Sequence, residues 1–146
     1  MYLHMQILRS RCLLKVQVTY DLGKDQRPSP RHGKTGVYEW EHFTVKSERD
    51  NFALGIGEQI RGQDEGHRND PLDRHNGKPF ATEDKWFKWY QNGCAQDYKA
   101  GWWYSNCFDI CLNCLRDRAL WKKSALLYDG EYETPTESIM WMKRVD

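Results

Sequence analysis

Alternating apolar and polar residues predict the first two strands of this chain. From Leu14 to Tyr20, every second residue is apolar and the residues between them are polar. This period is typical of a strand that is buried on one face. After a charged loop with proline and glycine at residues 21–36, the alternation returns in the run Val37–Val45. There, Tyr38 and Trp40 share one face, so we expect a second strand over this run.

The remaining periodic segments are short. Phe52–Ile56 repeats the two-residue period and predicts a third strand, so we expect three antiparallel strands joined by turns. Residues 62–78 are polar and glycine-rich without a period, which predicts a loop or a short helix. Near the end of the chain, Ser138–Arg144 predicts a last strand.

Composition narrows the class of protein. The 146 residues suffice for one modest core, so the chain is interpreted as a single domain, 1–146. The formal net charge is +1, so no strong field attracts nucleic acid or an anionic membrane surface. The apolar stretches are only a few residues long, which predicts no transmembrane segment.

The cysteines carry the most specific local signal. Cys94, Cys107, Cys111 and Cys114 lie close together, and Cys12 lies far upstream. In a secreted protein such a cluster indicates disulfides, whereas in a reducing compartment it indicates a metal site. The two residues between Cys111 and Cys114 also suit tetrahedral zinc, so a zinc-stabilised fold through this cluster stays an alternative.

The segment CAQDYKAGWWYSNC, from Cys94 to Cys107, gives the cluster a family context. It resembles the fibrinogen C-terminal domain of ficolins and tachylectin-like lectins, in which two cysteines also bracket a Trp-Trp-Tyr run. Shorter matches follow the family's order at Leu14–Val18, His75–Asp84 and Met142–Arg144. The family's opening portion has no counterpart, so the resemblance indicates an N-terminally truncated and divergent member.

The resemblance implies a fold and its parts. The fold would be α+β, with a twisted antiparallel sheet and a loop-rich, disulfide-containing C-terminal lobe. Residues 1–80 would form the sheet region, residues 81–137 the lobe that holds the ligand, and residues 138–146 the terminal strand.

The resemblance also implies that Cys94 and Cys107 form a disulfide. Cys111 and Cys114 fall where the family has no cysteine, and two interpretations stay open. They bridge each other, or one of them pairs with Cys12 or with another copy of the protein. A bond to another copy would give a disulfide-linked homo-oligomer.

Within the family, this lobe binds acetyl groups and sugars. The ligand-binding positions that the resemblance carries over are Tyr98, Tyr104, Asn106, Cys107 and Phe108. In the family, the peptide bond before the second cysteine is cis and turns a backbone N–H toward the ligand; here that bond joins Asn106 to Cys107. The paired Trp102 and Trp103 are interpreted as core residues.

In the family, a calcium ion stabilises the loop that binds the ligand. Two of the residues that coordinate this ion in the family are different in the present sequence. Calcium prefers several oxygen atoms, usually from more than one carboxylate. Asp84 keeps the first acidic position, but the two later carboxylate positions are Trp86 and Lys88. An ammonium group repels the cation, so we expect calcium binding to be lost and no cofactor to be needed.

Aromatic residues replace the polar calcium loop. They are Trp86, Phe87, Trp89 and Tyr90. Two interpretations stay open: they form an exposed patch for a glycan, a protein or a membrane surface, or they collapse into the space of the loop.

The sequence offers no support for an enzyme. We expect most of the five histidines to lie at the surface: His4, His32, His42, His67 and His75. No motif for a nucleophile or a phosphate-binding loop is present. We therefore expect non-enzymatic, extracellular recognition of acetylated glycans in innate defence, without calcium or with altered specificity. The alternative is a degenerate interaction or structural module that binds no sugar.

The N-terminus bears on localisation. Its first residues lack a basic run followed by an apolar one, so no signal peptide is predicted. A secreted member of the family would need such a leader, which fits the expectation of a truncated protein.

Overall fold

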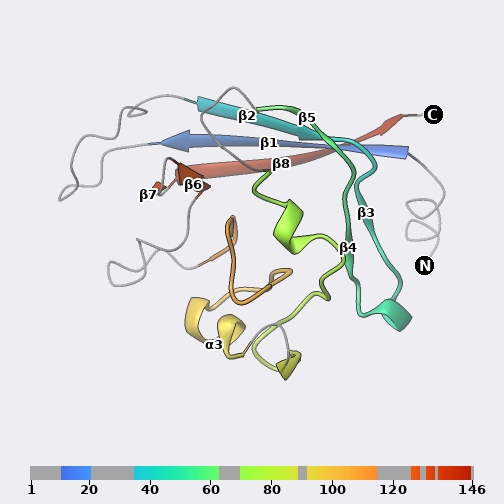
Figure 1. Ribbon diagram of the computed structural model, residues 1–146, viewed down its shortest axis with the longest axis vertical. Helices are drawn as coiled ribbons and strands as arrows, with labels where there is room; N and C mark the ends of the chain where they lie inside the picture. The colour runs from blue at the N-terminus through green and yellow to red at the C-terminus, as the bar shows by residue number, and fades with distance from the viewer. Residues whose placement is uncertain are drawn as a thin grey trace.

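An antiparallel sheet of four strands organises the chain in the order β5-β2-β1-β8 (Figure 1). Its strands are β1 (Arg11–Tyr20), β2 (Thr35–Trp40), β5 (Gln59–Arg61) and β8 (Pro135–Val145). This computed structural model describes residues 11–20, 35–62, 70–88, 92–114, 126–128, 131–133 and 135–145. The expected loop at residues 21–36 therefore lies mostly outside the described residues.

The alternation in the sequence sets the buried face of this sheet. Leu14 lies opposite Trp40, and Val16 lies opposite Tyr38. All four side chains are buried. Successive side chains of a strand point to opposite faces, so the polar residues between them lie on the other side of the sheet. The first strand and the buried face of the second are thus confirmed.

The second predicted strand breaks at His42. This residue has a φ of 54°, which is uncommon outside glycine, and the chain leaves the main sheet there. The next residues form β3 (Thr44–Val45), which pairs with β4 (Leu54–Gly55) in a separate two-stranded sheet. The prediction of one continuous strand over Val37–Val45 is therefore wrong.

The third predicted strand is much shorter than its pattern. Phe52 lies in a turn with a φ of 53°, after the short 3₁₀ helix η1 (Glu48–Asp50). Only β4 (Leu54–Gly55) forms, and it does not join the main sheet. The alternation at Phe52–Ile56 reflects burial of Leu54 and Ile56 rather than an extended strand.

The last predicted strand is confirmed and is longer than its pattern. It lies within β8, which begins at Pro135 and runs antiparallel to β1. In the sheet, β1 therefore lies between β2, which follows it in sequence, and β8, which is the last strand.

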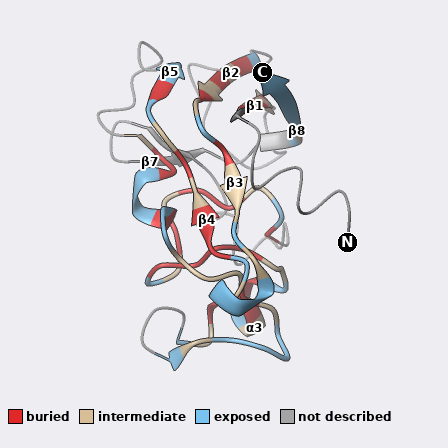
Figure 2. Cartoon of the chain, turned by 90° about the vertical axis from the view of Figure 1, so that its right-hand side faces the viewer, coloured by how far each residue is buried: buried red, intermediate tan, exposed pale blue. Residues whose placement is uncertain are grey.

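The C-terminal lobe lies beneath the sheet and shares its core. It contains the short helix α3 (Cys94–Tyr98) and the hairpin of β6 (Leu126–Tyr128) and β7 (Glu131–Glu133). The 3₁₀ helix η3 (Asp73–His75) precedes residue 81 but also contacts the lobe, through His75. Buried residues run from the sheet through the loops below it (Figure 2). The α+β fold with a loop-rich, disulfide-containing lobe is thus confirmed. In the described part of the chain, no helix has the length and apolar character needed to span a bilayer.

Replacing one core residue of β1 tests this arrangement. Leu14 is 1% exposed, so Leu14→Ala should lower the free energy of unfolding by about 2–5 kcal/mol through lost burial and the resulting cavity. Gln17→Ala, on the other face of the same strand, is the matched control and should change it by about 0.5 kcal/mol or less. Urea unfolding followed by tryptophan fluorescence measures both. Equal losses for the two variants would contradict the assigned faces.

Candidate functional site

One disulfide closes the loop that the resemblance assigns to the ligand, and a second follows it in the chain. Cys94, at the start of α3, is bonded to Cys107, with the two Cα atoms 5.3 Å apart. Cys111 is bonded to Cys114. The pairing implied by the resemblance is present, and of the two interpretations for the other pair, the structure shows the one in which they bridge each other.

These pairings decide between the alternatives for the cysteines. All four clustered sulfur atoms are in disulfides, so the zinc alternative lacks the thiolates that would coordinate the ion. Cys12 is the remaining free thiol, and it is only 6% exposed. Because Cys111 and Cys114 are bonded to each other, neither is available for the alternative pairing with Cys12 or with another copy.

Three of the predicted ligand-binding residues form a packed aromatic cluster. The ring of Phe108 contacts those of Tyr98 and Tyr104, at centroid distances of 4.7 and 6.4 Å. All three side chains are buried. The Tyr104 hydroxyl donates to the carbonyl oxygen of Ala100 at 2.9 Å, and burial raises the pKa of this hydroxyl far above its usual value. These rings form a floor under the loop and offer little exposed surface.

The other two predicted residues form the exposed tip of the loop. Asn106 and Cys107 both adopt left-handed backbone conformations, with φ of 47° and 58°. Asn tolerates this conformation, whereas Cys107 is held there by its disulfide and by the hydrogen bond from the Ser105 N–H to the Cys107 carbonyl. Asn106 is exposed and Cys107 is half-buried. The tip therefore presents the Asn106 side chain outward.

The peptide bond at this tip differs from the one that the resemblance implied. No described peptide bond is cis, so the Asn106–Cys107 bond is trans. The Cys107 N–H lies 3.1 Å from Sγ of Cys94 and points at the disulfide. The side chain of Asn106, rather than this N–H, is the polar group that the tip offers.

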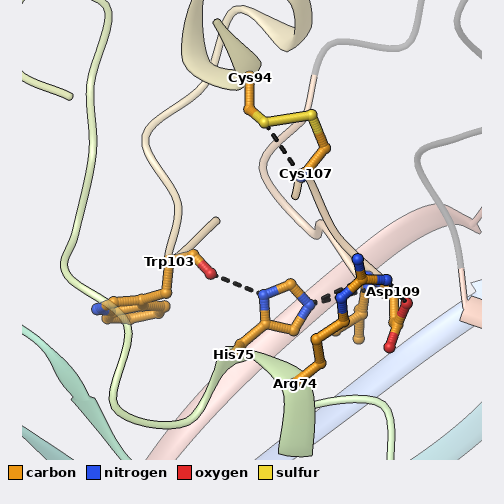
Figure 3. Close-up of polar contacts among 7 residues, drawn as sticks. Arg74, His75, Cys94, Trp103, Cys107 and Asp109 are labelled. Carbon is orange, nitrogen blue, oxygen red and sulfur yellow. Dashed lines mark hydrogen bonds and ion pairs between the residues drawn. A yellow bond between two sulfur atoms is a disulfide. The ribbon is translucent and has the colours of Figure 1, made fainter. Parts of the chain in front are cut away.

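A buried histidine connects three segments beneath the tip. Nδ1 of His75 lies 2.7 Å from the carbonyl oxygen of Trp103, and Nε2 accepts the N–H groups of Asp109 and Ile110 at 3.2 and 3.4 Å (Figure 3). Because Nε2 accepts both bonds, the proton of the neutral ring must sit on Nδ1. Just outside this contact, Arg74 forms an ion pair with Asp109 at 2.8 Å.

The structure corrects the expectation of a surface histidine at this position. His75 is 0% exposed, and its burial lowers the pKa of the imidazole, opposed by the bond to Trp103 and the charge of Asp109. His42 is exposed as expected. In the sequence, His75–Gly77 matches the family's His-Asn-Gly motif. This match points to the family but does not indicate that the imidazole is buried.

The paired tryptophans are core residues, as predicted. Trp103 donates its indole N–H to the carbonyl oxygen of Phe52 at 2.9 Å and packs edge-on against Phe80. Trp102 is 1% exposed and forms an isolated β-bridge with Ala81. Gly101 precedes the pair because a Cβ atom there would lie 2.8 Å from the Phe80 ring.

The described residues around Asp84 offer few free carboxylates to a cation. The Asp84 carboxylate accepts the Thr82 hydroxyl at 2.7 Å, and this bond lowers the pKa of the exposed carboxyl. The neighbouring Glu83 forms an ion pair with Lys99 at 3.0 Å. Across the described ranges, no cluster of three acidic, histidine or cysteine side chains could hold a metal ion.

The aromatic replacement of that loop is only partly described. Trp86 is 43% exposed, and Phe87 is half-buried. Trp89 and Tyr90 lie outside the described residues. At Trp86, the structure favours an exposed aromatic surface over collapse.

Comparisons with known proteins agree with this architecture. Residues 19–144 match the family model described as the C-terminal globular domain of fibrinogen beta and gamma chains. Tenascin-R of Homo sapiens is 33% identical over 66% of this chain, and techylectin-5A of Tachypleus tridentatus is 30% identical over 85% of it. The matches span 7% and 35% of those two proteins, so the present sequence matches a minor part of each.

Solved structures give the same result for the fold. The fibrinogen-like globe domain of human ANGPTL6 superposes with a TM-score of 0.71 at 22% identity, covering 98% of this chain and 61% of that one. Lamprey fibrin D-dimer gives a TM-score of 0.66 at 19% identity, covering 97% and 48%.

Acidification tests the neutral state of His75. Its pKa is lower in the folded state than in the unfolded one, so the unfolded state takes up the proton first as the pH falls, and stability is lost. Between pH 7 and pH 5 we expect the wild type to lose more stability than His75→Gln in urea unfolding, up to the limit of about 2 kcal/mol that the ordinary pKa of the unfolded histidine sets. Burial raises the pKa of the Asp70 carboxyl, so this group adds stability as the pH falls. Because Asp70 is present in every variant, its effect cancels in the comparison.

The matched control for this experiment is a substitution that leaves every titratable group in place. Gln17→Ala, on the far face of β1, should keep the pH dependence of the wild type. If the wild type and His75→Gln show the same pH dependence, the buried neutral imidazole is not the source of the effect.

The two disulfides should differ in their contribution to stability. Their sequence separations are 13 and 3 residues, and closing the longer loop restricts the unfolded state more. Replacing Cys94 and Cys107 with serine should cost about 3 kcal/mol, and replacing Cys111 and Cys114 about 2 kcal/mol. Urea unfolding of both double variants measures the difference. A larger loss for the shorter loop would mean that packing around Cys111 outweighs loop closure.

Proposed function

Because this protein belongs to the family of the C-terminal globular domain of fibrinogen beta and gamma chains, we propose that it is a non-enzymatic, extracellular recognition domain. Its ligands are acetylated glycans or glycoproteins, and its setting is innate defence. The similarity to techylectin-5A, a protein named as a lectin, over most of this chain supports the proposal.

The observation that carries the proposal is the exposed amide at the tip of the disulfide loop. An acetamido group has one N–H donor and one carbonyl acceptor, and the side chain of Asn106 offers the complementary acceptor and donor. The left-handed backbone, the Cys94–Cys107 disulfide and the buried rings fix the backbone that carries this amide before any ligand arrives. Such preorganisation reduces the entropy that binding costs.

We further propose that binding does not require calcium. Asp84 is engaged by Thr82, and the two later ligand positions are Trp86 and Lys88. The Cys94–Cys107 disulfide and the contacts of His75 take over the bracing of the loop, because both act on the segment that carries Asn106.

A second candidate function is a protein-interaction module without sugar binding. The exposed indole of Trp86 favours it, since tryptophan is enriched where proteins bind one another. The structure of lamprey fibrin D-dimer is described as a complex with the peptide Gly-His-Arg-Pro-amide, so this fold can also receive a peptide in that protein.

Affinity chromatography on immobilised N-acetylglucosamine tests the first proposal. We expect the folded, oxidised protein to be retained equally in calcium and in EDTA. Asn106→Gly removes the amide but keeps the left-handed backbone accessible, so it should weaken binding about tenfold, the value of roughly one good hydrogen-bonding group. Circular dichroism confirms that each variant is folded.

Two matched variants complete this experiment. Asn113→Ala removes another exposed amide of the lobe, and Asp84→Asn removes the remaining acidic position; both should bind as the wild type does. Release by EDTA would contradict the calcium-independent site. Failure of a folded wild type to bind would reject sugar recognition and favour the interaction module, whose binding Trp86→Ala should weaken.

A further inference from the structure

The sequence contains two Asn-Gly steps, one beside the lobe and one within it. Asn76-Gly77 follows η3, and Asn92-Gly93 precedes α3. Asparagine deamidates most readily before glycine, because glycine has no side chain to hinder the approach of its backbone nitrogen to the preceding amide. Each step is therefore a candidate for a spontaneous modification of the chain.

The two steps are equal in exposure and in steric access. Asn76 and Asn92 are both exposed. Gly77 and Gly93 both adopt left-handed backbone conformations, with φ of 74° and 84°. A Cβ atom at either glycine would meet no atom of a non-neighbouring residue closer than 3.9 Å. Any difference in reactivity between the steps therefore has to come from the hydrogen bonds of the folded protein.

Three hydrogen bonds protect Asn76-Gly77. The side-chain amide of Asn76 donates to the carbonyl oxygen of Ile56 and accepts the N–H of Ile56, each at 3.1 Å. The Gly77 N–H donates to the Leu54 carbonyl oxygen at 2.7 Å. Deamidation requires the nitrogen of Gly77 to attack the side-chain carbon of Asn76. Both reacting groups are thus already held by other partners.

Asn92-Gly93 lacks such protection among the described residues. Neither the Asn92 side chain nor the Gly93 N–H forms a hydrogen bond with any of them. The Gly93 carbonyl oxygen accepts the Asp97 N–H at 2.9 Å, but this oxygen takes no part in the attack. The step immediately precedes α3, which lies at the end of the lobe away from the main sheet (Figure 1 and Figure 2). The fold therefore separates two steps that are equivalent in the sequence.

We propose that Asn92 is a site of spontaneous deamidation in the folded protein and that Asn76 is not. The backbone nitrogen of Gly93 attacks Cγ of Asn92 and gives up its proton to water. A C–N bond forms, the bond from Cγ to the side-chain nitrogen breaks, and that nitrogen takes up a proton from water and leaves as ammonia. Water then opens the cyclic imide at either carbonyl, which yields aspartate or isoaspartate.

The modification changes the chain just before the disulfide loop. Either product carries a carboxylate, which is negatively charged at neutral pH. In isoaspartate, the main chain runs through the former side chain and is longer at a point shortly before Cys94, which the disulfide ties to Cys107. For the proposed recognition loop, this is an irreversible change that accumulates with the age of the protein. This consequence rests on the proposed function, whereas the modification itself does not.

Peptide mapping by mass spectrometry tests the proposal. The full, folded and oxidised protein is incubated at mildly alkaline pH and body temperature, and the deamidated fraction of each Asn-Gly step is followed over time. We expect Asn92 to react at least about tenfold faster than Asn76, because three hydrogen bonds have to break before Asn76 can react. An isoaspartate methyltransferase should label the peptide that contains Asn92.

The matched control is the same chain, reduced and unfolded in guanidinium chloride. There the two steps should react at similar rates, since the fold alone protects Asn76. In the folded protein, Asn92→Gln should abolish the fast reaction and leave the slow reaction of Asn76 unchanged, because glutamine forms the cyclic imide far more slowly. Asn92 is exposed, so this substitution should not disturb the fold.

Two results would overturn the proposal. The first is that Asn76 deamidates in the folded protein as fast as Asn92 or faster. The second is that folding slows the reaction of Asn92 as strongly as that of Asn76, which would reveal a protecting contact at Asn92. Because both measurements are made without a ligand, a failure to bind N-acetylglucosamine would reject the proposed function and leave the assignment of Asn92 standing.

Discussion

The buried imidazole of His75 is the contact on which the lobe depends. One neutral ring satisfies three backbone groups: the carbonyl of Trp103 and the N–H groups of Asp109 and Ile110. Buried backbone groups without partners cost free energy comparable to a lost hydrogen bond. Protonation of Nε2 would point its N–H at the N–H groups of Asp109 and Ile110, and both hydrogen bonds would be lost. His75 can therefore be buried in this position only while its ring is neutral. The position of the loop follows, since Trp103 and Asp109 lie on either side of its tip.

Other side chains near the lobe also form hydrogen bonds with backbone groups. In regular structure, strands and helices form these bonds. The side chain of Asn76 pairs with both backbone groups of Ile56, at 3.1 Å each, as a neighbouring strand would. The Asp70 carboxylate accepts the indole N–H of Trp40 and the N–H of Leu72, and so fastens the start of the lobe to β2. A lobe built from such contacts keeps irregular backbone in a fixed place, which suits the proposed role of the loop in presenting the Asn106 amide.

The sequence predicted the elements that depend on burial along a single strand. The two-residue period predicted β1, the buried face of β2 and the last strand. Burial of one face of a strand makes apolar and polar residues alternate, so the pattern is visible in neighbouring residues. The break at His42 escaped prediction because it is compensated by a distant segment: the N–H of the next residue, Phe43, donates to the Cys12 carbonyl. The turn at Phe52 is local, with its N–H donating to the Ser47 carbonyl, but the alternating burial of Leu54 and Ile56 imitated the period of a strand. For the site, the resemblance supplied the Cys94–Cys107 disulfide and the aromatic residues. The role of His75 required the three segments that meet at its ring, which no single stretch of sequence contains.

The most direct measurement of this account is the protonation state of the His75 ring by NMR, using two-bond couplings from the ring nitrogens in the full oxidised protein. The account predicts one neutral tautomer, with the proton on Nδ1 and a bare Nε2, which persists below the ordinary pKa of a histidine because burial lowers the pKa of His75. A proton on Nε2 at neutral pH, or a pKa of His75 at or above the ordinary value, would contradict the claim that a neutral, buried imidazole assembles the lobe.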